Sequence, residues 1–107
     1  MSDSMEIQNR RVLQELDQRV VEINAQHIEA RIGVVGKEDF IHLADLIAEL
    51  RAGYLKRVLE VSRGGEEALD DATRADLERQ RGLYQTALDG YLELKHALER
   101  GYFSLSI

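Results

Sequence analysis

The sequence predicts an all-α protein, because it contains no proline and because three long segments repeat apolar residues at helical spacing. Its 107 residues are enough for one small domain, so we expect a single domain over residues 1–107. Hydrophobic residues make up 44% of the chain and charged residues 32%, a balance that argues against disorder. The expected architecture is an antiparallel up-down-up three-helix bundle. Two such chains could also assemble into a homodimeric helical bundle through the same apolar positions.

The first helix is expected over about residues 3–31, with Asp3 as its N-terminal cap and Gly33 just beyond its end. Its apolar positions follow one another at alternating spacings of three and four residues, the pattern of a coiled-coil seam. These positions are Leu13, Leu16, Val20, Ile23, His27 and Ala30. We therefore expect this seam to face the other helices of the bundle.

The second and third helices are expected over about residues 38–62 and 73–100, and each has a seam of its own. Acidic residues in the first turn favour the start of the second helix, and Thr73 with Asp76 has the form of a capping box for the third. The second seam comprises Phe40, Leu43, Ile47, Leu50, Tyr54 and Val61, with Arg57 as a polar interruption. The third comprises Leu77, Gln80, Tyr84, Ala87, Tyr91, Leu94, Leu98 and Gly101, and Leu105 continues its register if the helix does not stop at Gly101. Residues 101–107 form an apolar tail.

Composition and motifs argue against several classes of function. With no cysteine, the chain cannot form a disulfide, a thiolate metal site or a cysteine nucleophile. No serine lies in a recognisable nucleophile motif and no glycine motif could hold a phosphate, so we favour a non-catalytic protein without a cofactor. The net charge of −6 disfavours nucleic acid and anionic lipid as partners. Without a signal peptide or a long apolar segment, the protein is expected to be cytoplasmic and not membrane-bound.

The three histidines were considered as metal ligands or switches. Glu93 and His96 have the Glu-x-x-His spacing of ferritin-like metal proteins, and Asp39 and His42 are spaced similarly. Both pairs lie beside their seams, so we expect solvated side chains and no metal site. His27 lies on the first seam itself, where it could be a buried structural residue or a pH-sensitive switch.

The favoured function is a protein–protein interaction module, an adaptor, chaperone-like or regulatory protein that acts as a homo-oligomer or with another protein. The alternative is a ferritin-like metal-binding protein assembled by oligomerisation. Partner-binding positions are expected on a second apolar line of the first helix, on the widened face of the second helix and in the tail, which either folds back on the chain or docks on a partner. These positions are Ile7, Val21 and Ile28, then Ile41, Ala48 and Leu55, and finally Tyr102, Phe103, Leu105 and Ile107.

Overall fold

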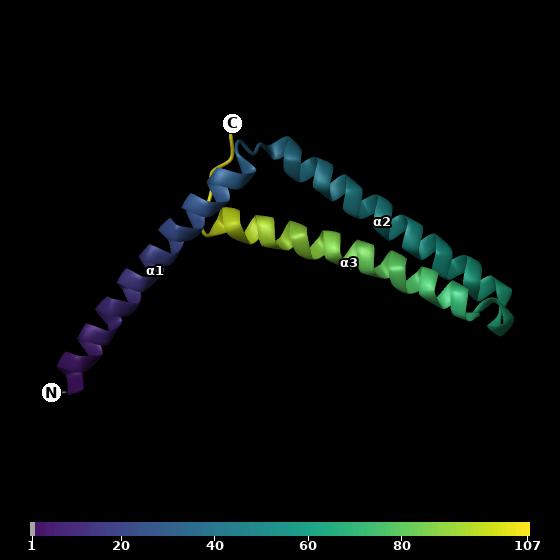
Figure 1. Cartoon of the computed structure of the whole chain (residues 1–107), viewed down its shortest axis with the longest axis horizontal. Coiled ribbons are helices and arrows are strands. Elements are labelled where there is room, and N and C mark those ends of the chain that lie inside the picture. Colours follow the sequence, from purple (N-terminus) through teal and green to yellow (C-terminus); the bar gives the residue numbers. More distant parts are fainter. Residues whose placement is uncertain (1) are drawn as a thin grey trace. The chain divides into compact units, whose positions relative to one another are not determined.

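A computed structural model describes residues 2–107 and confirms the all-α class (Figure 1). Its long helices are α1 (Ser2–Ile32), α2 (Lys37–Gly64) and α3 (Asp71–Glu99), and a short 3-10 turn, η1 (Glu66–Ala68), connects α2 to α3. The chain divides into two compact units. One unit is Lys37–Leu94, and the other combines the residues before Lys37 with Lys95–Ile107.

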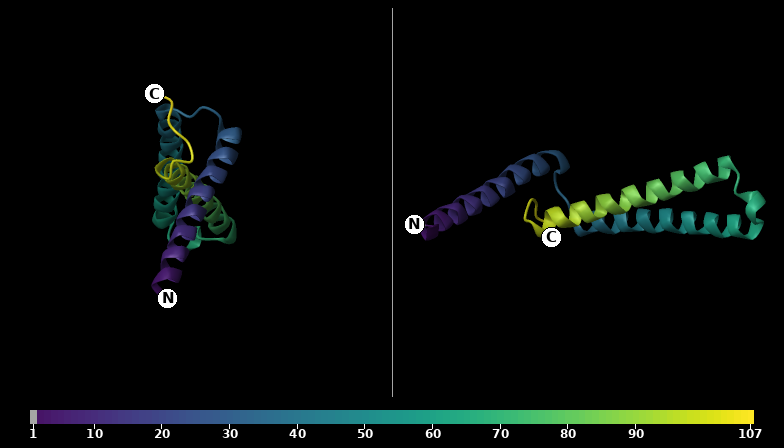
Figure 2. Two further views of the ribbon diagram at one scale, coloured as in Figure 1. Left: turned by 90° about the vertical axis from the view of Figure 1, so that its left-hand side faces the viewer. Right: turned by 90° about the horizontal axis from the view of Figure 1, so that it is seen from below.

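The unit formed by Lys37–Leu94 is an antiparallel helical hairpin. Figures 1 and 2 both show α2 and α3 side by side, with the turn between them at one end. Contacts along the pair involve increasing residue numbers in α2 and decreasing numbers in α3, as antiparallel packing requires. They join the rings of Phe40 and Tyr91, with centroids 6.0 Å apart, Arg51 Nε and the Tyr84 hydroxyl at 3.0 Å, and Arg57 Nε and Asp76 Oδ2 at 3.2 Å.

The predicted seams of α2 and α3 form the interior of this hairpin. Every predicted seam position from Phe40 to Leu98, Arg57 included, is buried or half-buried, whereas the residues that widen the apolar face of α2 are exposed. The last predicted position of the third seam, Gly101, is exposed and lies beyond the end of α3. Ile47, near the middle of α2, is only 6% exposed. Residues spaced three and four apart lie on one narrow face of a helix. The seams of α2 and α3 therefore form two facing apolar stripes, and their contact holds the hairpin together.

The other unit is organised around the α1–α2 connection. Gly33 ends α1 at φ 65°, and its N–H donates to the Glu29 carbonyl oxygen at 3.2 Å. Gly101 ends α3 at φ 76° in a Schellman motif, in which the Tyr102 N–H donates to the Ala97 carbonyl oxygen at 2.9 Å. Both turns need a positive φ, which glycine adopts without a steric penalty.

The tail that follows Gly101 packs within the chain. The backbone N–H of Ser106 donates to the Val35 carbonyl oxygen at 2.8 Å, and Gly36 and Ser106 form an isolated parallel bridge. Val35 is 8% exposed and Phe103 only 4%. Of the two arrangements considered for the tail, the structure therefore has the one in which it folds back on its own chain.

The expected compact three-helix bundle is wrong, because only α2 and α3 pair through their seams. The seam of α1 is exposed, from 46% at Val20 and Ile23 to 53% at Leu16 and 61% at Leu13. His27 and Ala30 on the same line are also exposed. A seam pattern shows that a helix is suited to pack against a neighbour, but it does not specify that the same chain supplies this neighbour.

The start of α3 also differs from the expectation. The carboxylate of Asp70 accepts a hydrogen bond from the Thr73 backbone N–H at 2.8 Å, so Asp70 is the cap and the helix begins at Asp71. The predicted box between Thr73 and Asp76 is not the cap of this helix, and Asp76 accepts hydrogen bonds from Arg57, Arg79 and Gln80.

Candidate protein-binding surface

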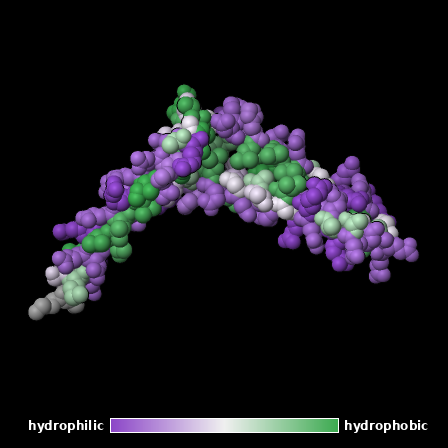
Figure 3. All heavy atoms as spheres, viewed as in Figure 1, coloured by the Kyte–Doolittle hydropathy of each residue, from purple (hydrophilic) through white to green (hydrophobic). Residues whose placement is uncertain are grey.

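The most prominent exposed apolar feature is a line of four side chains on α1, which we call the α1 stripe. Side chains three and four residues apart lie on the same face of a helix, so these four form one continuous surface about three turns long. Figure 3 shows hydrophobic atoms in a row along α1. The α1 stripe consists of Leu13, Leu16, Val20 and Ile23, each at least 46% exposed.

The polar groups beside the α1 stripe have partners within the helix. Arg19 forms an ion pair with Glu22 at 2.8 Å, and the Asn24 amide donates to the Val20 carbonyl oxygen at 2.9 Å. At the end of the stripe, Arg31 Nη1 lies 3.2 Å from His27 Nδ1. Several polar side chains at the border of the stripe thus have partners within α1, whereas the apolar side chains of the stripe are open to solvent.

His27 is exposed in this structure and does not lie in a core. Besides its 3.2 Å contact with Nδ1, Arg31 Nη1 donates a hydrogen bond to the His27 backbone carbonyl oxygen at 3.1 Å. A role for His27 as a switch stays a prediction.

The second apolar line of α1 divides into two parts. Ile7 is 57% exposed, whereas Val21 and Ile28 are half-buried. These three residues are predicted to form a partner surface, whereas the α1 stripe is predicted to face the other helices. All four residues of the stripe are exposed, but only Ile7 of the second line is.

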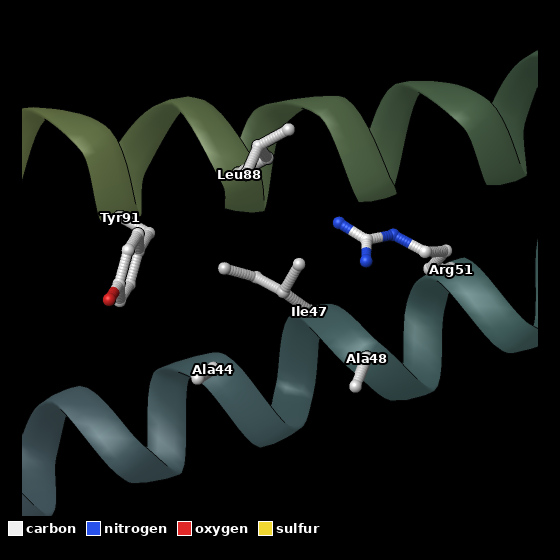
Figure 4. A pocket seen from close by; sticks show the side chains of 6 residues that line it. All are labelled: Ala44, Ile47, Ala48, Arg51, Leu88 and Tyr91. Atoms are coloured by element: carbon white, nitrogen blue, oxygen red, sulfur yellow. The ribbon is translucent and has the colours of Figure 1, made fainter.

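The hairpin also carries apolar residues on its outer side. Ile41 is 48% exposed and Leu55 is 52% exposed, and the exposed Ala48 lies between them at seven-residue spacing on α2. Beside Ala48, a groove of about 260 Å³ opens between α2 and α3 (Figure 4). Its size is below that of ordinary small-molecule pockets, which hold about 300–1,000 Å³, but it could accept one apolar side chain of another helix. The groove is lined by Ala44, Ile47, Ala48, Arg51, Leu88 and Tyr91.

The predicted tail residues have different environments. Phe103 is buried by contacts within the chain, Tyr102 and Leu105 are half-buried, and Ile107 is exposed. The tail residue with the largest apolar side chain thus already has a structural role. The part of the tail open to a partner is its end, at Ile107.

The residues considered as metal ligands lie on the surface. His42, Glu93 and His96 are all exposed, as their positions beside the seams predict. Among residues 2–107, no group of three or more histidine, aspartate or glutamate side chains is arranged to hold a metal ion.

The two carboxyl groups with clearly shifted pKa values lie at the turn end of the hairpin. The Arg79 guanidinium beside Asp76, with further hydrogen bonds from Arg57 and Gln80, lowers the pKa of the Asp76 carboxyl below its usual range. The backbone N–H of Thr73 likewise lowers the pKa of Asp70. Both shifts arise from hydrogen bonds that join or cap helices. The two carboxylates therefore contribute to the stability of the hairpin.

Acid should weaken the hairpin through Asp76. A carboxyl whose pKa is lower in the folded state stabilises it above the ordinary pKa of aspartate, and this contribution disappears as the pH falls through the folded-state pKa. We expect Asp76→Asn to lower the melting temperature near pH 7 and to reduce the further loss seen below about pH 4. Thermal melting followed by circular dichroism would measure this effect, with the exposed Glu78→Gln as control. An unchanged acid response in Asp76→Asn would contradict it.

Comparison with other proteins gives no further assignment, since no protein-family model, curated protein or solved structure matches this chain. Over the part of the chain that the structure describes, none of the helices is both long and apolar enough to span a membrane.

Sequence reasoning missed the α1 stripe as a surface because its pattern is the same as that of the two paired seams. Spacing alone does not separate the three seams, because three such helices can also pack around one common core.

Proposed function

We propose that this protein is a non-catalytic protein–protein interaction module that binds a helix of another polypeptide chain through the α1 stripe. The observation that carries the proposal is the contrast between three seams of equal spacing. Those of α2 and α3 are buried against each other, whereas all four apolar residues of the α1 stripe are about half exposed or more. Contiguous exposed apolar surface of this kind is typical of interaction sites.

The energetic gain on covering the α1 stripe is large enough for binding. Full burial of a leucine, isoleucine or valine side chain contributes about 1.5–3 kcal/mol, and here about half of each side chain remains to be buried. Four side chains therefore offer roughly 3–6 kcal/mol from this helix alone, before the partner's own surface and the entropy cost of association are counted.

A helical partner fits the stripe best. Spacings of three and four residues place side chains as knobs that enter the holes of a facing helix. An extended peptide strand would need free backbone groups to pair with, and the backbone of α1 is used in its own helical hydrogen bonds. The recognition mode is therefore helix on helix.

The proposal can be tested by photo-crosslinking in the cells that make the protein. A photoreactive amino acid replaces Val20 on the stripe or, as a matched control, Gln18 on the opposite side of the same helix. We expect an adduct with another polypeptide, of whatever identity, from position 20 and much less from position 18. Equal yields from both positions, or no adduct from position 20, would overturn the proposal.

A further inference from the structure

We infer that the partner of the α1 stripe is a second copy of this chain, and that the two α1 helices pair antiparallel about a twofold axis near Gln18. This inference rests on the proposed function and identifies the partner of the same surface. Four features support it: the exposed area, the number of unpaired seams, the position of the apolar residues along α1, and the polar residues at their ends.

The chain exposes more than enough area for a dimer interface. The chain exposes 8586 Å² at a mass of 12.2 kDa. A typical folded monomer of this mass exposes about 6,000 Å², so the excess is roughly 2,500 Å² per chain. A stable interface removes about 800 Å² from each partner, and obligate homodimers remove more. Covering the α1 stripe with another copy would account for part of the excess.

The number of unpaired seams also favours a second copy. Each chain has three seams, and α2 and α3 bury two of them against each other. One seam per chain is left over, and a second copy brings a seam of the same length, spacing and residue composition. The unpaired seams of two copies can thus pack against each other in an isologous contact. Twofold dimers with such contacts are the commonest homo-oligomers.

The positions of the apolar residues suit an antiparallel pair. The four residues of the stripe are placed symmetrically about position 18 along the helix. In an antiparallel pair centred there, Leu13 lies opposite Ile23 of the second copy, and Leu16 lies opposite Val20 of the second copy. Every apolar residue of the stripe then has an apolar neighbour, and the apolar layers occupy the centre of the contact.

The same register pairs the polar residues at the ends of the stripe. Asn9 is the next seam position before Leu13, and in this register it lies opposite His27 of the second copy. The Asn9 side-chain amide has both a donor and an acceptor, so it can pair with a ring nitrogen of His27 in either tautomer. A polar layer in an otherwise apolar seam fixes the register of helix pairing.

A parallel pair is less favourable for this helix. Every seam residue would then face its own copy, so Glu6 would lie beside Glu6 of the second copy and the two helix dipoles would align. The antiparallel register places Glu6 opposite Ala30 of the second copy instead. The antiparallel register also brings Asp17, next to the seam, close to Asp17 of the second copy, which is unfavourable because both carry the same charge. A parallel pair lacks this contact, so its effect on affinity distinguishes the two arrangements.

Spin-label distances in the purified protein test both the dimer and its direction. The chain has no cysteine, so Gln8→Cys or Arg19→Cys supplies a single labelling site, and both positions are exposed on the same side of α1, beside the seam. At 1.5 Å per residue, antiparallel pairing separates the two Gln8→Cys labels by about 30 Å along the helices. The Arg19→Cys labels lie beside the seam, one residue from the symmetry centre, so they would be separated mainly by the interaxial distance, about 10 Å, and the length of the labels. A parallel pair gives equal short distances at both sites and would overturn the inference.

The approach of Asp17 to its copy supplies a second readout. We expect Asp17→Asn to tighten self-association about twofold at low salt, because it removes a like-charge contact that is present only in the antiparallel register. Glu15→Gln makes the same change of charge on the outer side of α1 and should leave the affinity unchanged. Equal affinities of wild type and Asp17→Asn would contradict the register.

The failure of this inference can be separated from the failure of the proposed function. If the purified chain sediments as a monomer at micromolar concentration, yet position 20 crosslinks to a different protein in cells, the second copy is excluded and the interaction module is retained. If the purified chain is monomeric and position 20 gives no adduct, both are overturned. A dimer with a long Gln8→Cys distance and a short Arg19→Cys distance supports both.

Discussion

Replacement of two residues of the α1 stripe by glutamate, Leu16→Glu with Val20→Glu, should convert the self-associated protein into a monomer. In the antiparallel register these residues face each other across the dimer, so the double variant places four carboxylates in two adjacent apolar layers. Burying an unpaired carboxylate costs several kcal/mol, so we expect the affinity to fall by at least about a hundredfold. Sedimentation equilibrium of wild type and variant would measure this change.

The matched control is Gln14→Glu with Gln18→Glu, which adds the same charge to exposed positions of α1 outside the stripe. Because these side chains point away from the seam, this control should associate like the wild type. Equal helicity by circular dichroism would show that both double variants fold. Retained association in the stripe variant would place the interface elsewhere, whereas loss in both variants would assign the effect to net charge.

The second large effect is expected at Phe103. This side chain is 4% exposed, beside a connection in which Val35 is 8% exposed. Removal of a buried phenylalanine ring costs about 3–5 kcal/mol, through lost burial and the cavity that remains. We therefore expect Phe103→Ala to lower the free energy of unfolding by this amount, measured by urea denaturation of the whole chain.

The control for Phe103→Ala is Ile107→Ala, which removes an apolar side chain from the same tail at an exposed position. Exposed substitutions usually change stability by less than about 0.5 kcal/mol. Similar stability of Phe103→Ala and wild type would show that the tail does not hold the α1–α2 connection. A drop in stability for Ile107→Ala alone would assign this role to the chain end.

The paired seams of α2 and α3 could be predicted from sequence because their spacing sets which face of each helix is apolar. Every predicted seam residue, from Phe40 to Leu98, is buried or half-buried. The same reasoning failed for α1, because its residues have the same spacing and spacing does not specify which chain supplies the neighbour. His27 lies on this α1 seam, so its spacing favours a buried position, but the side chain is exposed.

The packing of the tail could not be derived from periodicity. Phe103 and Val35 are far apart in sequence, and neither belongs to a helical repeat that would predict its burial. Gly33 was recognised as the end of α1, but the direction taken by the chain after Gly101 depends on the Schellman turn and on the hydrogen bond from Ser106 to Val35. Such long-range contacts are set by tertiary packing, which local patterns do not encode.

The central claim is that another chain covers the α1 stripe, and backbone hydrogen exchange over residues 12–24 at increasing protein concentration tests it most directly. An isolated helix without tertiary contacts is only marginally stable in water, so these amides should exchange fast when the protein is dilute. We expect their exchange to slow as concentration rises and chains associate, while the amides around Ile47 in the hairpin remain equally protected throughout. Slow exchange over residues 12–24 in a dilute monomer, unchanged by concentration, would show that the chain covers the stripe itself and would contradict the claim.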